Sequence, residues 1–147
     1  LAGHTAPGSR PAPRTLRAAG AASAMARGRT CYDHLAGRLG ITVTEAMTAR
    51  GLLRQDAGFA LTPQGVGWFS TLGLELGPRG RRPLVRSCLD WTERKPHLAG
   101  AAGAALCRHA LDSGWCVRIG SQRAVKVTPD GERAFAELLG IEPEILR

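Results

Sequence analysis

The chain has 147 residues, 44% of them hydrophobic, and a formal net charge of +8 at neutral pH. This length corresponds to one domain or two very small ones, and no run of about 18 apolar residues occurs that would span a membrane. We also expect no secretory leader, and therefore a cytoplasmic protein whose four cysteines stay reduced.

The positive charge is concentrated at the start of the chain. Residues 1–30 contain five arginines and no acid, whereas residues 31–147 carry fifteen basic and twelve acidic groups. Such a segment is typical of weak contact with nucleic-acid phosphates, although a GC-rich genome favours arginine as well. The candidate DNA-contacting residues are Arg14, Arg17, Arg79, Arg81 and Arg82.

Residues 1–28 form the first predicted segment. Proline, glycine and arginine are frequent there and no apolar period runs through its first half, which indicates a flexible linker. Residues 15–27 are compatible with a helix that frays or that needs a partner, because they contain Gly20 and few large apolar side chains.

The rest of the chain contains an internal sequence repeat. The phrase "RTCYDHLAG" at Arg29 is followed later by "RSCLDWTERKPHLAG" at Arg86, and the two histidines, His34 and His97, lie 63 positions apart. "LTPQG" at Leu61 likewise recurs as "VTPDG" at Val127. Duplication of one supersecondary unit explains this pattern, with small loop insertions such as "WTERKP".

Each copy predicts a helix, a β-hairpin and a second helix. The first helix of each copy follows the histidine and ends at Gly51 or Gly114. The hairpins are expected at residues 52–61 and 115–127, and the second helices are expected to be capped by Thr62 and Thr128, each followed by proline.

The expected fold is therefore mostly α with short β-hairpins, built from duplicated, degenerate winged-helix-like units. We place the first unit at residues 29–80 and the second at residues 81–147, packed together as one compact domain. Only 11 positions separate Gly40 from Gly51, and Gly103 from Gly114, which leaves no room for a separate recognition helix. We expect Trp68, Trp91 and Trp115 to be substantially buried in a shared core.

These residues resemble a known family. The stretches "RTCYDHLAGRLGITVTEAMTARGLL", "LTPQGVGWFSTLGLE", "RRPLVRSCLDWTERKPHLAGAAGAAL" and "GERAFAELLGIE" are similar to the C-terminal region of ArsR/SmtB-type transcriptional regulators. The resemblance implies a regulator that binds DNA through a winged-helix domain preceding this region. We expect that this domain is missing from the chain. This chain would then be the effector-sensing or dimerisation region, expected as a homodimer.

The cysteines and histidines of the repeated phrase are the candidates for chemistry. Cys31 and His34 lie three positions apart, on one helix face if the helix begins that early, and Cys88 and His97 hold the equivalent places. Small buried side chains at a joint between the units are one interpretation. The other is a sensor site for zinc or another soft divalent metal, because two cysteines and two histidines form a common zinc ligand set.

Three functional classes remain open from the sequence. The first is the effector and dimerisation region of a regulator, in which a metal or thiol sensor is one possibility. The second is a stand-alone winged-helix protein that binds DNA weakly through its Arg-rich arm. An enzyme is not expected, because no acid–base or nucleophile pattern is visible.

Overall fold

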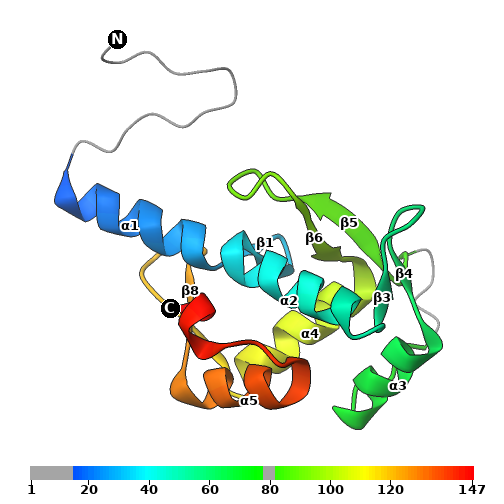
Figure 1. Cartoon of the computed structure of the whole chain (residues 1–147). Coiled ribbons are helices and arrows are strands. Elements are labelled where there is room, and N and C mark those ends of the chain that lie inside the picture. Colours follow the sequence, from blue (N-terminus) through cyan, green and yellow to red (C-terminus); the bar gives the residue numbers. More distant parts are fainter. Residues whose placement is uncertain (1–14, 78–81) are drawn as a thin grey trace.

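The computed structural model describes residues 15–77 and 82–147, and these form five α-helices and four two-stranded antiparallel hairpins (Figure 1). The first repeat contains β1 (Arg29–Cys31), β2 (His34–Ala36), α2 (Gly37–Ala49), β3 (Leu53–Arg54), β4 (Ala60–Leu61) and α3 (Pro63–Thr71). The second repeat contains β5 (Arg86–Leu89), β6 (Pro96–Ala99), α4 (Gly100–Asp112), β7 (Cys116–Arg118), β8 (Val125–Val127) and α5 (Pro129–Leu139). Helix α1 (Leu16–Arg27) precedes them and the short 3₁₀ helix η1 (Pro143–Leu146) follows. The predicted fold class, mostly helical with repeated helix–hairpin units, is confirmed.

The start of each repeat differs from the prediction. The Cys–His phrase forms a β-hairpin, in which Cys31 lies opposite His34 and Cys88 lies opposite His97. The helices begin only at Gly37 and Gly100, so the expected helical face with Cys31 and His34 does not exist. Both glycines have positive φ, 71° and 82°, a conformation that turns the chain out of the strand and that L-residues rarely adopt.

The ends of the helices follow the local sequence signals. Gly51 and Gly114 lie just beyond α2 and α4 with φ of 74° and 75°, as expected for glycines that end helices. Thr62 and Thr128 cap α3 and α5 by accepting hydrogen bonds from the backbone N–H groups three residues later. Thus the hairpins and second helices lie where sequence reasoning placed them.

One cluster of buried side chains draws on both repeats. Leu39, Met47 and Phe69 from the first repeat and Leu106 and Phe135 from the second belong to it. Helix α1 contributes no buried residue and lies along one side of the molecule (Figure 1). None of the helices in the described ranges is long and apolar enough to cross a bilayer.

The tryptophans only partly match their prediction. Trp68 and Trp115 are half-buried and pack against the core. Trp91 is 47% exposed, which contradicts the expectation of burial. It lies in the turn after β5, where its ring lies 4.7 Å from the guanidinium carbon of Arg29 rather than in the apolar interior.

Candidate metal centre

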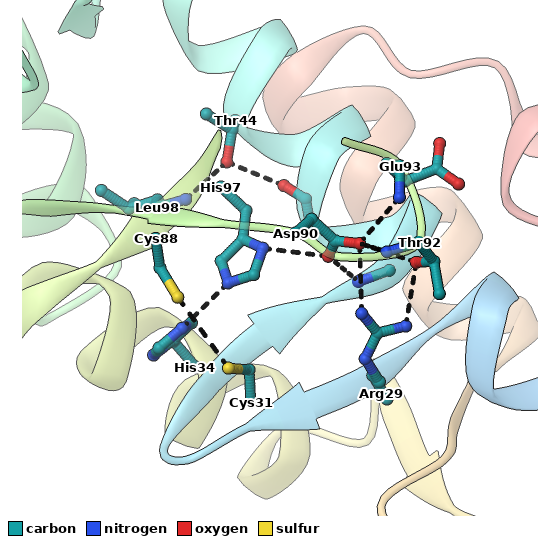
Figure 2. Close-up of polar contacts among 12 residues, drawn as sticks. Arg29, Cys31, His34, Thr44, Cys88, Asp90, Thr92, Glu93, His97 and Leu98 are labelled. Carbon is teal, nitrogen blue, oxygen red and sulfur yellow. Dashed lines mark hydrogen bonds and ion pairs between the residues drawn. The ribbon is translucent and has the colours of Figure 1, made fainter. Parts of the chain in front are cut away.

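The four residues singled out from the repeated phrase converge at one point. Strand β2 contacts β6, so the two Cys–His hairpins face each other (Figure 2). The sulfurs of Cys31 and Cys88 are 3.9 Å apart, and the Nε2 atoms of His34 and His97 are 3.0 Å apart. One ligand atom from each of the four residues lies within 4.8 Å of all the others.

These separations match a four-coordinate site. With Zn–S bonds of about 2.3 Å and Zn–N bonds of about 2.0–2.1 Å, a tetrahedral ion places its two sulfurs about 3.8 Å apart and its two nitrogens about 3.4 Å apart. The observed distances of 3.9 Å and 3.0 Å differ from these by only a few tenths of an ångström. The residues therefore fit one zinc-sized ion and could hold it with little movement.

The other two cysteines are chemically different. Cys107 and Cys116 are buried, 3% and 1% exposed, and burial raises the pKa of Cys107 to about 11 and that of Cys116 to about 12. Both are protonated thiols packed in the core at neutral pH. Cys31 and Cys88 are only half-buried, and burial and the neighbouring Cys31 raise the pKa of Cys88.

Each histidine is oriented by a carboxylate on its other ring nitrogen. Nδ1 of His97 lies 3.0 Å from Asp90 Oδ2, and Nδ1 of His34 lies 3.3 Å from Asp33 Oδ1. A carboxylate accepts a hydrogen bond, so we assign the proton to Nδ1 in both rings and a lone pair to Nε2. Burial lowers the pKa of both histidines, which favours neutral imidazole, the form that binds metals.

This assignment creates a conflict that a cation resolves. Two neutral imidazoles would point lone pairs at each other across the 3.0 Å between the Nε2 atoms of His34 and His97. Like lone pairs repel, so the contact needs either a proton on one of the two Nε2 atoms or a metal ion between them. The two cysteine sulfurs beside them make a soft metal ion the better match, because thiolates need positive charge nearby.

The ion pairs around the site cross between the repeats. The repeated Arg-x-Cys-x-Asp pattern allows two roles for Asp33 and Asp90, a charge at a helix start or an ion pair with the arginine of the same copy. The structure contradicts the second role. Asp90 instead contacts Arg29 of the first repeat at 3.1 Å, and Asp33 contacts Arg82 of the second at 2.6 Å. Because the two hairpins face each other, each acid meets an arginine of the opposite repeat.

Asp90 is the most heavily bonded of the polar side chains described here. Its two oxygens are fully buried and accept hydrogen bonds from the Gly37 N–H at the start of α2, from Arg29 and from His97, and also from Thr92 and Glu93 (Figure 2). Although burial alone would raise the pKa of Asp90, these donors hold it well below the usual range. Sequence reasoning treated the "WTERKP" stretch as a loop insertion and missed this role, which the "DWT" pattern of an Asp with a hydroxyl residue two positions later could have indicated.

Two helix glycines let each helix pack closely on the strand before it. A Cβ on Gly40 of α2 would lie 2.4 Å from the Leu35 carbonyl oxygen, and one on Gly103 of α4 would lie 2.8 Å from the Leu98 carbonyl oxygen. The Cβ atoms of the opposite histidines, His97 and His34, would lie farther away, at 3.6 Å and 3.3 Å. In addition, Thr44 of α2 accepts a hydrogen bond from the Leu98 N–H, next to His97. The repeated glycines therefore serve the close packing of α2 on β2 and of α4 on β6, beside the joint between the repeats.

The candidate DNA contacts are dispersed. Arg17 is exposed on α1, and Arg82 is half-exposed but paired with Asp33 in the wall of the joint. Arg14, Arg79 and Arg81 lie outside the described residues. The contribution of these five arginines to DNA binding stays a prediction.

Comparison with known proteins gives one informative match. The chain is 41% identical over 117 residues to a Bacillus subtilis (strain 168) protein named "Uncharacterized HTH-type transcriptional regulator YdfF". The matched region is 78% of this chain and 52% of that protein, so the chain spans about half the length of the relative. No family model and no solved structure matches the chain. The chain is thus a homologue of an HTH-type transcriptional regulator.

Proposed function

We propose that this chain is the effector-sensing and dimerisation region of an ArsR-type transcriptional regulator, and that its effector is a soft divalent metal ion such as zinc. The ligands would be the two thiolates and two imidazoles of the repeated phrase: Cys31, His34, Cys88 and His97. The homologous regulator and the resemblance to ArsR/SmtB proteins support the regulatory part of the proposal.

The observation that carries the metal assignment is the pair of facing Nε2 atoms beside the pair of facing sulfurs. Carboxylates hold Nδ1 of both histidines, so both Nε2 lone pairs are available at the same point. The set has four protein ligands and therefore no open position for a substrate water, which is typical of structural or sensing sites rather than catalytic ones.

The position of the site suggests how binding would be sensed. Each repeat supplies one cysteine and one histidine, so an ion would tie β1–β2 to β5–β6 and hold the repeats in one arrangement. Without the ion, the two histidines share at most one proton, and the contact between the two thiols does not stabilise the joint. Metal occupancy would thereby control how firmly the repeats are joined.

Metal binding by the purified chain tests this proposal. We expect one zinc or cobalt ion per chain by elemental analysis and Co²⁺ absorption typical of a tetrahedral site with two thiolates. Cys88→Ser and His34→Gln should each weaken binding strongly, whereas His109→Gln, at a half-buried histidine of α4 next to Trp115, should leave it unchanged. A protein that binds no metal after reduction and reconstitution would refute the metal assignment.

The regulatory part needs a separate measurement. The natural full-length protein should bind DNA from its own promoter with an affinity that changes when zinc is added or chelated. The His34→Gln protein should have lost this dependence while keeping DNA binding in one of the two states. DNA binding that is identical with and without metal would leave the ion a purely structural role and exclude metal sensing.

A further inference from the structure

We infer that Asp33 and Asp90 are positioning residues of the metal site, and that each is held in place by an arginine of the opposite repeat. This inference rests on the proposed metal site. It adds that affinity for the ion depends on two crossed chains of contacts, Arg29–Asp90–His97 and Arg82–Asp33–His34.

The first chain of contacts is rigid. Arg29 is 3% exposed, and besides Asp90 its guanidinium donates to the Met25 carbonyl in α1 at 2.9 Å and to Thr92 Oγ1 at 3.1 Å. Asp90 is thereby held in place. Its Oδ2 also accepts from the Gly37 N–H, and it can accept from His97 when that ring carries its proton on Nδ1. This contact fixes both the plane of the ring and the tautomer that leaves Nε2 free.

The second chain of contacts performs the same task near the surface. The Asp33 side chain is 31% exposed, and its two oxygens are divided between His34 Nδ1 at 3.3 Å and Arg82 at 2.6 Å. Asp33 lies in the turn between β1 and β2, outside the core cluster. Like Asp90, it contacts Nδ1 of the histidine of its own repeat, which points to orientation of the histidine rather than to packing.

The two aspartates also explain why the site forms only when the repeats are docked. Each histidine comes with an aspartate from its own repeat, but each aspartate is held by an arginine from the other. Separating the repeats would remove Arg82 from Asp33, and Arg29 and the Gly37 N–H from Asp90, while Thr92 and Glu93 would still bond Asp90. Both imidazoles would then be held less firmly in the tautomer with a proton on Nδ1. The carboxylates thus link the packing of the two repeats to the histidine tautomer that can bind a metal ion.

Asp33 is the residue to test, because substitution of the buried Asp90 removes six hydrogen bonds and can prevent folding. We expect Asp33→Ala to lower zinc affinity by about 10- to 100-fold in chelator competition. Asp33→Asn should lose less, because an amide oxygen still accepts the Nδ1 proton. Asp56→Ala is the matched control, since it removes a carboxylate from an exposed ion pair with Arg54.

A second measurement separates positioning from simple structural support. In ¹⁵N-labelled protein, His34 should have its proton on Nδ1 in the wild type and a mixture of tautomers in Asp33→Ala when metal-free. The cobalt spectrum of the variant should keep its shape, because the four ligands remain. Loss of stability without loss of affinity or tautomer preference would contradict a positioning role.

The possible failures are distinguishable. If the wild type binds no zinc, the proposed metal function fails, and this inference fails with it. If the wild type binds zinc but Asp33→Ala binds it equally well, only the positioning role is refuted. Equal loss in Asp33→Ala and Asp56→Ala would show a general effect of charge and would also overturn it.

Discussion

The four cysteines form two pairs that differ in burial, because Cys31 and Cys88 are half-buried and Cys107 and Cys116 are buried. We predict that iodoacetamide at about pH 8 labels Cys31 and Cys88 in the folded, metal-free protein but not Cys107 or Cys116. The latter two are shielded in the core, and burial raises their pKa to about 11 and about 12, so at this pH they stay thiols, whereas the thiolate is the reactive form. Burial and the neighbouring Cys31 raise the pKa of Cys88 as well, so we expect Cys88 to react slowly.

Peptide mapping by mass spectrometry after a short reaction checks this prediction. Added zinc should protect Cys31 and Cys88 in the wild type, and unfolding in denaturant should expose all four thiols equally. Labelling of Cys116 at the rate of Cys31 in the folded protein would contradict the buried, inert assignment.

At the scale of single residues, the sequence indicated the candidate metal ligands better than the residues around them. Cys31, His34, Cys88 and His97 could be selected because each occurs at an equivalent position of the repeat and because their side chains bind soft metals. The partner of Asp33 could not, because Arg82 lies six positions before Cys88 and outside the repeated phrase. Only the face-to-face placement of the hairpins decides which arginine each acid meets.

Helix α3 offers a matched pair of glycines for a test at the scale of one element. A Cβ on Gly65 would lie 2.1 Å from the Leu52 carbonyl oxygen, whereas one on Gly67 would meet nothing within 4 Å. We expect Gly65→Ala to destabilise the fold by about 2 kcal/mol, because backbone must move to relieve the overlap. Gly67→Ala should stabilise it by about 0.5–1 kcal/mol, because alanine is the better helix former.

Urea denaturation of both variants against the wild type gives the comparison. The midpoint should fall for Gly65→Ala and rise for Gly67→Ala, with similar slopes if both unfold in one step. Equal midpoints for the two variants would mean that α3 does not press against the Leu52 carbonyl as described.

Elements with strong local signals were predictable and the first hairpins were not. Proline after a capping threonine located α3 and α5, and Gly58 and Gly120 marked the turns of the β3–β4 and β7–β8 hairpins. The β1–β2 hairpin has three-residue strands and a turn with Tyr32 at φ 58°, so neither an alternating pattern nor a glycine revealed it.

For the whole molecule we predict weak DNA binding without sequence preference. Of the five arginines in residues 1–30, Arg29 is buried against Asp90, which leaves four in the N-terminal segment and α1. Contacts from such a segment release counterions, so we expect affinity to fall at least about tenfold between about 50 and 200 mM salt.

Fluorescence anisotropy with two unrelated DNA duplexes checks this expectation. Replacing Arg14 and Arg17 by alanine should weaken binding to both duplexes, whereas Arg133→Ala, on exposed α5 surface, should have less effect. Tight binding to one duplex that persists at high salt would show a sequence-reading surface in this chain and contradict the prediction.

The architecture as a whole was predictable because duplication is visible in the letters. The same apolar and turn positions recur, so helix–hairpin–helix units followed directly. How the two copies pack against each other could not be predicted from the local sequence. It depends on the two Cys–His hairpins, which bring His34 to His97 and Cys31 to Cys88, and no clear sequence signal marked those hairpins.

The crossed ion pairs have a consequence for how the sequence can change in evolution. Neither copy contains the arginine that its own aspartate needs, because Arg29 serves Asp90 and Arg82 serves Asp33. A mutation in one copy must therefore be compensated in the other, and the copies cannot drift apart as independent modules. Natural variants should keep or replace the two residues of each pair together, Arg29 with Asp90 and Arg82 with Asp33. The two copies would then evolve as one unit.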